Sequence, residues 1–298
     1  MNKVICLFGP TCSGKTHLSI DIAEKFGLSI ISADSMQVYK KMDIGTAKIT
    51  EKEMRGIKHH LIDIRFPDEY FTTNDFFKLC NEKISSNHNR NIPAFVVGGT
   101  GLYFKSLIHG MSNAPGKNEE IRQNIETRYK ENPKEVFAEL EAVDPDYAKI
   151  IHQNDLRRIT RALEIYYLTQ KPFSKMDNNT PKYSYFIIGL NPDRNALYNR
   201  IDLRCNEMIK NGLIEETREL VNEYGKHHYS FKAIGYSHAI RFQDNEISRD
   251  DFYNLFKRDT RRFAKRQLTL FRAIENVHWF ENPDISILSD MINRFIME

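Results

Sequence analysis

A glycine-rich stretch near the start of the chain has the residue types and spacing of a phosphate-binding loop. In GPTCSGKT, four residues separate Gly9 from Gly14, and Lys15 and Thr16 follow directly. Glycines let backbone N–H groups turn toward an anion, the lysine supplies a positive charge, and the threonine hydroxyl can bind a magnesium ion. We therefore predict that the whole stretch holds the phosphates of a ligand: Gly9, Pro10, Thr11, Cys12, Ser13, Gly14, Lys15 and Thr16.

The sequence on either side supplies the elements that such a loop requires. Residues 3–8 predict a short buried strand, and residues 17–26 predict a helix with Leu18, Ile22 and Phe26 on one side. The positive end of that helix would point at the bound phosphates. The loop does not identify the ligand, because a kinase, a nucleotide hydrolase and a transferase that holds a diphosphate would all contain such a loop.

A candidate acid–base residue follows the next predicted strand. Residues 29–32 are rich in β-forming types and lead to Asp34 and Ser35. Ligands gather at the carboxyl ends of parallel strands, so we expect Asp34 to lie near the phosphates. The alternative is that Asp34 only turns the chain after the strand.

The remaining pattern predicts a doubly wound parallel α/β core. Short strands are predicted within residues 59–64 and 92–99, with a helix over residues 71–89 between them. From about Met111 the pattern becomes helical, bounded by SNAPGK and MDNNTPK, until a strand over residues 183–190. We predict an α/β core domain of residues 1–112 and 183–298 and a helical insertion domain of residues 113–182. Further helices are expected near residues 194–224 and 249–276, and the last two dozen residues give no functional signal.

Basic residues are concentrated in two predicted helices, although the net charge is only +3. Residues 257–272 contain seven basic residues and one acid; as a helix they would place a basic stripe on one face and Phe256, Phe263, Leu270 and Ile274 on another. Arginines cluster again in DLRRITRALEIYY. Two such helices in a nearly neutral chain favour a bound polyanion, with a solvated helix face as the alternative.

Composition places the chain among soluble globular proteins. It has 298 residues, of which 41% are hydrophobic and 28% charged, enough for one large α/β domain and a smaller one. The four cysteines lack CxxC spacing, which argues against a disulfide framework or a zinc site. We expect a cytoplasmic monomer without a signal peptide or a membrane span.

Eight motifs in a fixed order resemble the tRNA dimethylallyltransferases, also called tRNA isopentenyltransferases. They are GPTCSGKT, ISADSMQVYKKMDIGTAK, HHLID, VVGGTGLYF, NDLRRITRALEIY, RIDLRCNEMIKNGLIEE, AIGY and TRRFAKRQLTLFR. The resemblance implies a fold like that of P-loop nucleotide kinases with a helical insertion that grips the anticodon arm. It implies transfer of a dimethylallyl group from dimethylallyl diphosphate, with Mg²⁺, to N6 of the adenosine 3′-adjacent to the anticodon of a tRNA.

The resemblance also assigns roles to individual residues. Asp34 matches the family's catalytic aspartate, which suits an adenine amine that reacts only as its proton leaves. Thr100 matches a residue near the target base, and a helix cap is a compatible role. For Arg200 and Arg204 we expect phosphate contacts, with surface pairing to Asp202 or Glu207 as the alternative.

Other residues are expected to contact tRNA, some by the resemblance and some by the basic stripe. They are Asp34, Ser35, Met36, Gln37, Thr100, Arg122, Arg157, Arg158, Ile159, Thr160, Arg161, Lys232, Arg261, Lys265 and Arg266. A base that leaves its stack to reach a buried diphosphate also requires a channel and an apolar wedge, which the sequence does not identify.

Three positions depart from the family pattern. Lys58 stands where proline is usual, Lys232 where glutamine is commoner, and Ser237 where a basic residue is expected. The last two put fine RNA specificity in doubt. Two rival functions share the phosphate-binding loop: a small-molecule enzyme, either a nucleotide kinase or an adenylate prenyltransferase, and a non-catalytic RNA-binding module of the GTPase type.

Overall fold

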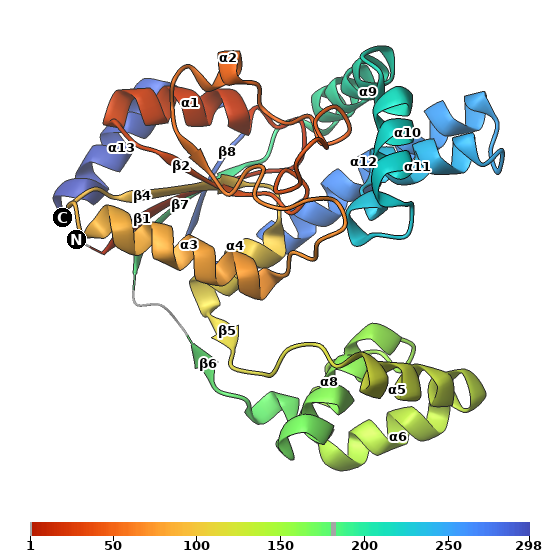
Figure 1. The fold of residues 1–298 in the computed structure, drawn as a ribbon. Helices are drawn as coiled ribbons and strands as arrows, with labels where there is room; N and C mark the ends of the chain where they lie inside the picture. Colours follow the sequence, from red (N-terminus) through yellow and green to blue (C-terminus); the bar gives the residue numbers. More distant parts are fainter. Residues whose placement is uncertain (1, 180–182) are drawn as a thin grey trace. The chain divides into compact units, whose positions relative to one another are not determined.

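A computed structural model describes residues 2–179 and 183–298. The described chain forms two compact units, one of residues 2–108 and 183–298 and one of residues 109–179 (Figure 1). Each unit has its own apolar core. The first unit contains the phosphate-binding loop.

The first unit is built on one six-stranded parallel sheet in the order β3-β2-β4-β1-β7-β8. The strands are β1 (Lys3–Phe8), β2 (Ile30–Ala33), β3 (His59–His60), β4 (Ala94–Gly98), β7 (Ser184–Leu190) and β8 (Val277–Phe280). Val4 of β1 lies opposite Ala94 of β4 and Tyr185 of β7. The central strands β1, β2, β4 and β7 are mostly apolar and buried because helices cover both faces. The predicted doubly wound α/β fold is confirmed.

Alternating side chains of β1 point to two different cores. Ile5 and Leu7 pack with α1 (Lys15–Phe26) and α13 (Ile285–Met297). Val4, Cys6 and Phe8 pack with α3 (Thr73–His88) and α4 (Gly101–His109) on the other face (Figure 1). The period of two along the strand therefore produces a three-layer arrangement.

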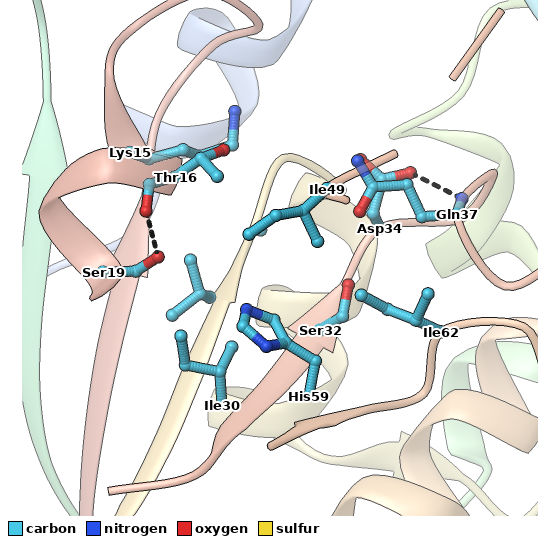
Figure 2. Close-up of a pocket in the computed structure, with 12 residues that line it drawn as sticks. Lys15, Thr16, Ser19, Ile30, Ser32, Asp34, Gln37, Ile49, His59 and Ile62 are labelled. Atoms are coloured by element: carbon cyan, nitrogen blue, oxygen red, sulfur yellow. Dashed lines mark hydrogen bonds between the residues drawn. The ribbon is translucent and has the colours of Figure 1, made fainter. Parts of the chain in front are cut away.

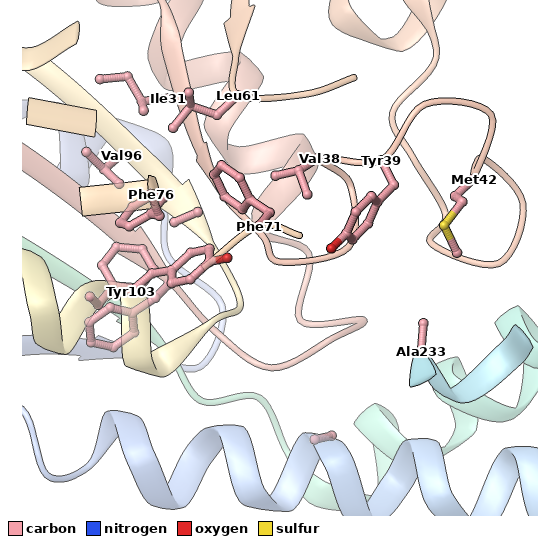
Figure 3. Close-up of a cluster of buried hydrophobic side chains, with 14 of the residues drawn as sticks. Ile31, Val38, Tyr39, Met42, Leu61, Phe71, Phe76, Val96, Tyr103 and Ala233 are labelled. Carbon is pink, nitrogen blue, oxygen red and sulfur yellow. The ribbon is translucent and has the colours of Figure 1, made fainter. Parts of the chain in front are cut away.

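The larger core extends from the sheet into the loop that follows β2. Phe76 and Tyr103 stack with ring centroids 4.1 Å apart, and the cluster continues through Val38, Tyr39 and Met42 (Figure 3). Burial of each such side chain contributes about 1.5–3 kcal/mol. The loop after Asp34 is thus anchored by its own apolar residues.

Besides the short helix α2 (Glu51–Met54), four longer helices complete the first unit. They are α9 (Arg194–Lys210), α10 (Leu213–Tyr224), α11 (Ile234–Gln243) and α12 (Arg249–Phe271). The helix predicted over residues 194–224 is interrupted because Gly212 takes a left-handed φ of 100°. A short 3-10 turn, η2 (Tyr229–Lys232), precedes α11.

The predicted apolar face of α12 is wrong in its second half. Phe256 and Ile274 are buried as expected, but Phe263 and Leu270 are 38% and 43% exposed. In the first half of α12, Phe252 stacks on Phe242 of α11 with ring centroids 5.6 Å apart, whereas the second half packs against the end of β1. Phe271 stacks on Phe8 there with ring centroids 4.3 Å apart. This change of partner moves the buried stripe and turns Phe263 outward.

The second unit is helical, with helices α5 (Glu119–Glu131), α6 (Pro133–Val143), α7 (Pro145–Ala148) and α8 (Leu156–Thr169) around their own apolar cluster. Two short antiparallel strands, β5 (Met111–Ser112) and β6 (Asn178–Asn179), were not expected in the helical pattern. The last residues of the predicted insertion, 180–182, lie outside the described residues.

Glu164 organises the interior of the helical unit. Its carboxylate accepts hydrogen bonds from Arg122 (2.8 Å from each of two nitrogens), Arg161 (2.7 Å) and the backbone N–H of Asn118 (2.7 Å). Burial alone would raise the pKa of Glu164, but these donors lower it below the ordinary value of 4.5. Arg122 and Arg161 therefore stabilise this unit from within.

Candidate functional site

The predicted phosphate-binding loop connects β1 to α1 and has the geometry of an anion cradle. Gly14, the N-cap of α1, has a left-handed φ of 90° that few other residues adopt. A Cβ on Gly9 would lie 2.6 Å from Ser13 Oγ, so only glycine fits at that turn. The loop therefore leads into the amino terminus of a twelve-residue helix, whose free N–H groups favour a bound anion.

Two cations converge on this loop. Lys15 Nζ donates a hydrogen bond to Pro10 O at 3.0 Å, and desolvation lowers its pKa from 10.5 to about 8, although Asp34 opposes the shift. Arg204 Nη1 lies 3.4 Å from Thr11 Oγ1, which places it beside the loop, and its phosphate contact stays a prediction. Arg200 is exposed, and Asp202 pairs with Arg261 at 2.9 Å.

Gln267 of α12 holds the loop in place and was not predicted. Its Oε1 accepts a hydrogen bond from Thr11 N at 2.9 Å, and its Nε2 donates one to Gly99 O at 2.8 Å. The side chain is buried, so the two bonds connect the ends of β1 and β4 through a third element. Its one signal in the sequence is a polar residue within the apolar stripe of α12.

Asp34 lies at the carboxyl end of β2 and performs two tasks. Its Oδ1 accepts hydrogen bonds from Met36 N at 2.9 Å and Gln37 N at 3.3 Å, so Asp34 does turn the chain (Figure 2). Asp34 also lines the same cavities as Lys15 and Thr16. The carboxylate is therefore oriented by the backbone and still faces a ligand space.

Thr100 connects the ends of β2 and β4. Its N–H donates to Ala33 O at 3.1 Å, and its Oγ1 accepts from Ser35 N at 3.0 Å. A Cβ on Gly98 would lie 2.2 Å from Ala33 O, so the two strands approach too closely for any other residue there. Thr100 lies near Asp34 because these two parallel strands approach so closely.

One cavity of about 370 Å³ brings most of these residues together. Side chains from the loop, from the segment after β2 and from α9, η2 and α12 line it: Thr11, Cys12, Lys15, Thr16, Asp34, Ser35, Met36, Gln37, Gly45, Thr46, Thr100, Ile201, Arg204, Cys205, Met208, Tyr229, Lys232, Ala233, Ile234, Gly235, Phe256, Thr260, Phe263, Arg266 and Gln267. A smaller space of about 50 Å³ shares Lys15, Thr16, Asp34 and Gln37 with it (Figure 2). We call the larger space the main cavity.

Glu216 of α10 fixes the loop that forms one wall of the main cavity. Its carboxylate accepts hydrogen bonds from three consecutive backbone N–H groups, those of residues 43–45, at 2.8–3.1 Å, and from Tyr236 Oη at 2.5 Å. A Cβ on Gly45 would lie 2.5 Å from the Tyr236 ring. Nothing in the local sequence connects residues 43–45 with α10, so this contact could not be predicted.

The residues predicted to contact tRNA are placed unequally. In the first unit Lys232 and Arg266 line the main cavity, and Lys265 is exposed, but Arg261 is engaged by Asp202. In the helical unit Arg157 and Arg158 are exposed. The side chains of Ile159 and Thr160 are buried, and the tRNA contact of the stretch that contains them stays a prediction.

The chemistry of the side chains sets limits on a metal site. Within residues 2–179 and 183–298, no three His, Cys, Asp or Glu side chains gather in a way that would hold a metal ion. All four cysteines are free thiols.

Within residues 2–179 and 183–298, no helix combines the length and apolar character needed to cross a bilayer.

Comparison with known proteins gives one consistent result. The family model for IPP transferase matches residues 37–274. The chain is 43% identical to the tRNA dimethylallyltransferase of Finegoldia magna over 97% of this chain and 94% of that protein. It is 44% identical to the tRNA dimethylallyltransferase of a Thermoanaerobacter species, over 99% and 96% of the two chains.

Two solved structures extend the similarity to the fold. The full-length tRNA isopentenylpyrophosphate transferase of Bacillus halodurans is 38% identical with a TM-score of 0.74, over 100% of this chain and 97% of that one. A eukaryotic dimethylallyltransferase acting on tRNA is 27% identical with a TM-score of 0.83, over 99% and 80%. The similarity therefore includes both units.

Proposed function

Because the chain belongs to the tRNA dimethylallyltransferase family of IPP transferases, we propose that it moves a dimethylallyl group from dimethylallyl diphosphate to a tRNA. The acceptor is N6 of the adenosine 3′-adjacent to the anticodon. The observation that carries this proposal is the main cavity, in which the phosphate-binding loop and Asp34 face one ligand space of about 370 Å³. In this proposal the loop holds the leaving group and Asp34 is the proton acceptor.

The leaving diphosphate would bind at the loop. An allylic C–O bond breaks readily once the charge on the departing oxygen is neutralised. Lys15, Arg204 and the free N–H groups at the start of α1 are positioned to do this, because they surround the same loop. Fixed positive groups aimed at developing negative charge lower the barrier without reorganisation.

The donor set near the loop fits a magnesium ion. Mg²⁺ commonly uses one or two protein oxygens and completes its shell with substrate phosphates and waters. The Thr16 hydroxyl lines the main cavity and would supply one such oxygen. When bound, the ion would neutralise charge on the diphosphate oxygens.

Asp34 would accept the proton of the nucleophile. The exocyclic amine of adenine has a lone pair delocalised into the ring, so it attacks carbon only as it loses a proton. As the N–C bond forms and the C–O bond of the donor breaks, one N–H proton would pass to Asp34. The bonds from Met36 N and Gln37 N fix the carboxylate, and Thr100 fixes the adjoining backbone.

An Asp34→Asn variant tests this assignment. We expect turnover to fall by about 10² or more, as for loss of a general base, while tRNA affinity changes only a few-fold. Asp68→Asn, on an exposed turn, is the matched control. An Asp34→Asn enzyme with near-normal turnover would remove Asp34 from the mechanism.

The rival functions require different substrates. A small-molecule enzyme would form product from AMP and not from tRNA, and a GTPase-type module would hydrolyse a nucleoside triphosphate and keep its function in the Asp34→Asn variant. Prenylated adenosine detected by mass spectrometry after incubation with tRNA and dimethylallyl diphosphate excludes both. Cytoplasmic location and a monomeric state stay predictions from the sequence.

A further inference from the structure

Two exposed aromatic rings line the main cavity from different elements. Tyr229 of η2 is 39% exposed and Phe263 of α12 is 38% exposed. Each has a cation over its ring: Lys232 Nζ lies 5.7 Å from the centroid of Tyr229, and Arg266 Cζ lies 5.9 Å from that of Phe263. The cavity is therefore lined by two aromatic–cation pairs.

The exposure of these rings distinguishes them from the other apolar lining residues. Ile201, Ala233 and Phe256 line the same cavity but are buried. Exposed apolar side chains that gather at one concave site mark a place of contact with a ligand. Phe263 also lies outside the buried stripe of α12, although its spacing in the sequence predicted a buried position.

The charge around the rings favours a polyanion. Lys15, Arg204, Lys232 and Arg266 line the main cavity, and among its described lining residues Asp34 is the only acid. Aromatic rings interleaved with cations are the usual surface for unpaired nucleotides, because rings stack on bases while cations meet phosphates. When a base leaves its stack, the bases on either side of it lose a stacking partner, and an aromatic side chain can replace it.

Resting on the proposed function, we propose that Phe263 and Tyr229 are base-stacking residues for the unpaired RNA nucleotides at the main cavity. Their rings stack on the target base or on the bases beside it. Lys232 and Arg266 neutralise the adjoining phosphates. The two pairs thereby favour RNA in which the target nucleotide is unpaired.

The test uses the complete protein and an anticodon stem-loop RNA with 2-aminopurine in place of the target adenosine. The fluorescence of 2-aminopurine rises when the base leaves its stack, and no prenyl donor is added. For Phe263→Ala and Tyr229→Ala we expect RNA binding about 5- to 140-fold weaker, the range for loss of one stacked base, with a smaller fluorescence rise. Phe263→Trp should restore both. Leu203→Ala, which removes an exposed side chain of α9 outside the cavity, should match the unmodified protein.

Phe263→Leu covers the case in which Phe263→Ala fails to fold, because leucine keeps the apolar volume and removes the ring face. The proposal is overturned if Phe263→Ala and Phe263→Leu both bind RNA normally. It is also overturned if, in a separate turnover assay with donor, these two variants raise only the KM for dimethylallyl diphosphate, which would assign the ring to the donor's five-carbon tail. Binding and fluorescence are measured without donor, so they do not depend on prenyl transfer. Absence of prenyl transfer by the unmodified protein would therefore refute the proposed function without affecting the test of base stacking.

Discussion

Replacement of Lys15 by methionine should abolish catalysis and stabilise the fold. Methionine keeps most of the aliphatic stem of lysine and removes the ammonium group. That group lies among protein atoms at the loop, and desolvation lowers its pKa from 10.5 to about 8. A lowered pKa means that the folded protein favours the neutral amine, so the charged lysine destabilises the ligand-free enzyme.

The size of the effect follows from the same numbers. A fall from 10.5 to about 8, at 1.36 kcal/mol for each pKa unit, corresponds to about 3 kcal/mol as an upper limit. Lys15 keeps some solvent contact, and the variant loses the hydrogen bond to Pro10 O, for which about 1 kcal/mol is deducted. We expect a net gain of about 1–2 kcal/mol in the free energy of unfolding at pH 7, or about 2–3 °C in Tm.

The stabilisation should depend on pH in a defined direction. Below pH 8 lysine is charged in both states and the full penalty applies. Between pH 8 and 10.5 the unfolded state binds more protons than the folded state, so the stability of the unmodified protein rises with pH. The advantage of Lys15→Met should therefore be largest near pH 7 and shrink through pH 8–10.

The assay is thermal and denaturant unfolding of both proteins at pH 7, 8.5 and 9.5 in a buffer without phosphate. Added inorganic diphosphate should raise the Tm of the unmodified protein by mass action and leave that of Lys15→Met almost unchanged. A variant less stable than the unmodified protein at pH 7, or an advantage that is the same at every pH, would refute the reasoning.

Three further changes have expected outcomes. Glu216→Gln should lower turnover and cost about 1–3 kcal/mol of stability, because a backbone N–H of residues 43–45 loses its acceptor; kcat and unfolding measurements check this. Glu164→Gln should lower the stability of the helical unit, residues 109–179, by about 3–5 kcal/mol, which faster amide hydrogen exchange in these residues would show. In the unmodified protein, the stability of this unit should fall only as the pH drops below 4.5. Arg266→Ala should reduce the salt dependence of RNA affinity by about one unit of slope, whereas Arg261→Ala should mainly lower stability.

Local signals account for the parts of the site that were predicted. The phosphate-binding loop could be identified because each residue type has its own task within eight positions, and the flanking strand and helix have their own hydrophobic periods. Asp34 could be expected near the bound phosphates because ligands gather at the carboxyl ends of parallel strands. Its connection to Thr100, through Ala33 O and Ser35 N, needed the structure.

Contacts between distant segments account for what could not be predicted. Gln267 lies 256 residues from Thr11, and Glu216 lies 171 residues from Gly45, so no local pattern joins either pair. β8 is a short edge strand with two exposed residues, which removes the apolar run that would reveal it. Phe263 was misplaced because a helical period assumes one constant partner, whereas α12 changes partner along its length.

The arginine-rich helices show why a count of charges is a weak guide to RNA contacts. In α8, Arg161 donates a hydrogen bond to the buried Glu164. Its neighbours in the sequence, Arg157 and Arg158, are exposed instead. In α12, Arg261 faces Asp202 of α9, whereas Arg266 lines the main cavity. A basic residue is available to a phosphate only when no acid of the same fold already engages it, and that acid is supplied by another helix or another turn. The polyanion inferred from charge density therefore depends on the subset of basic residues that the fold leaves facing a ligand.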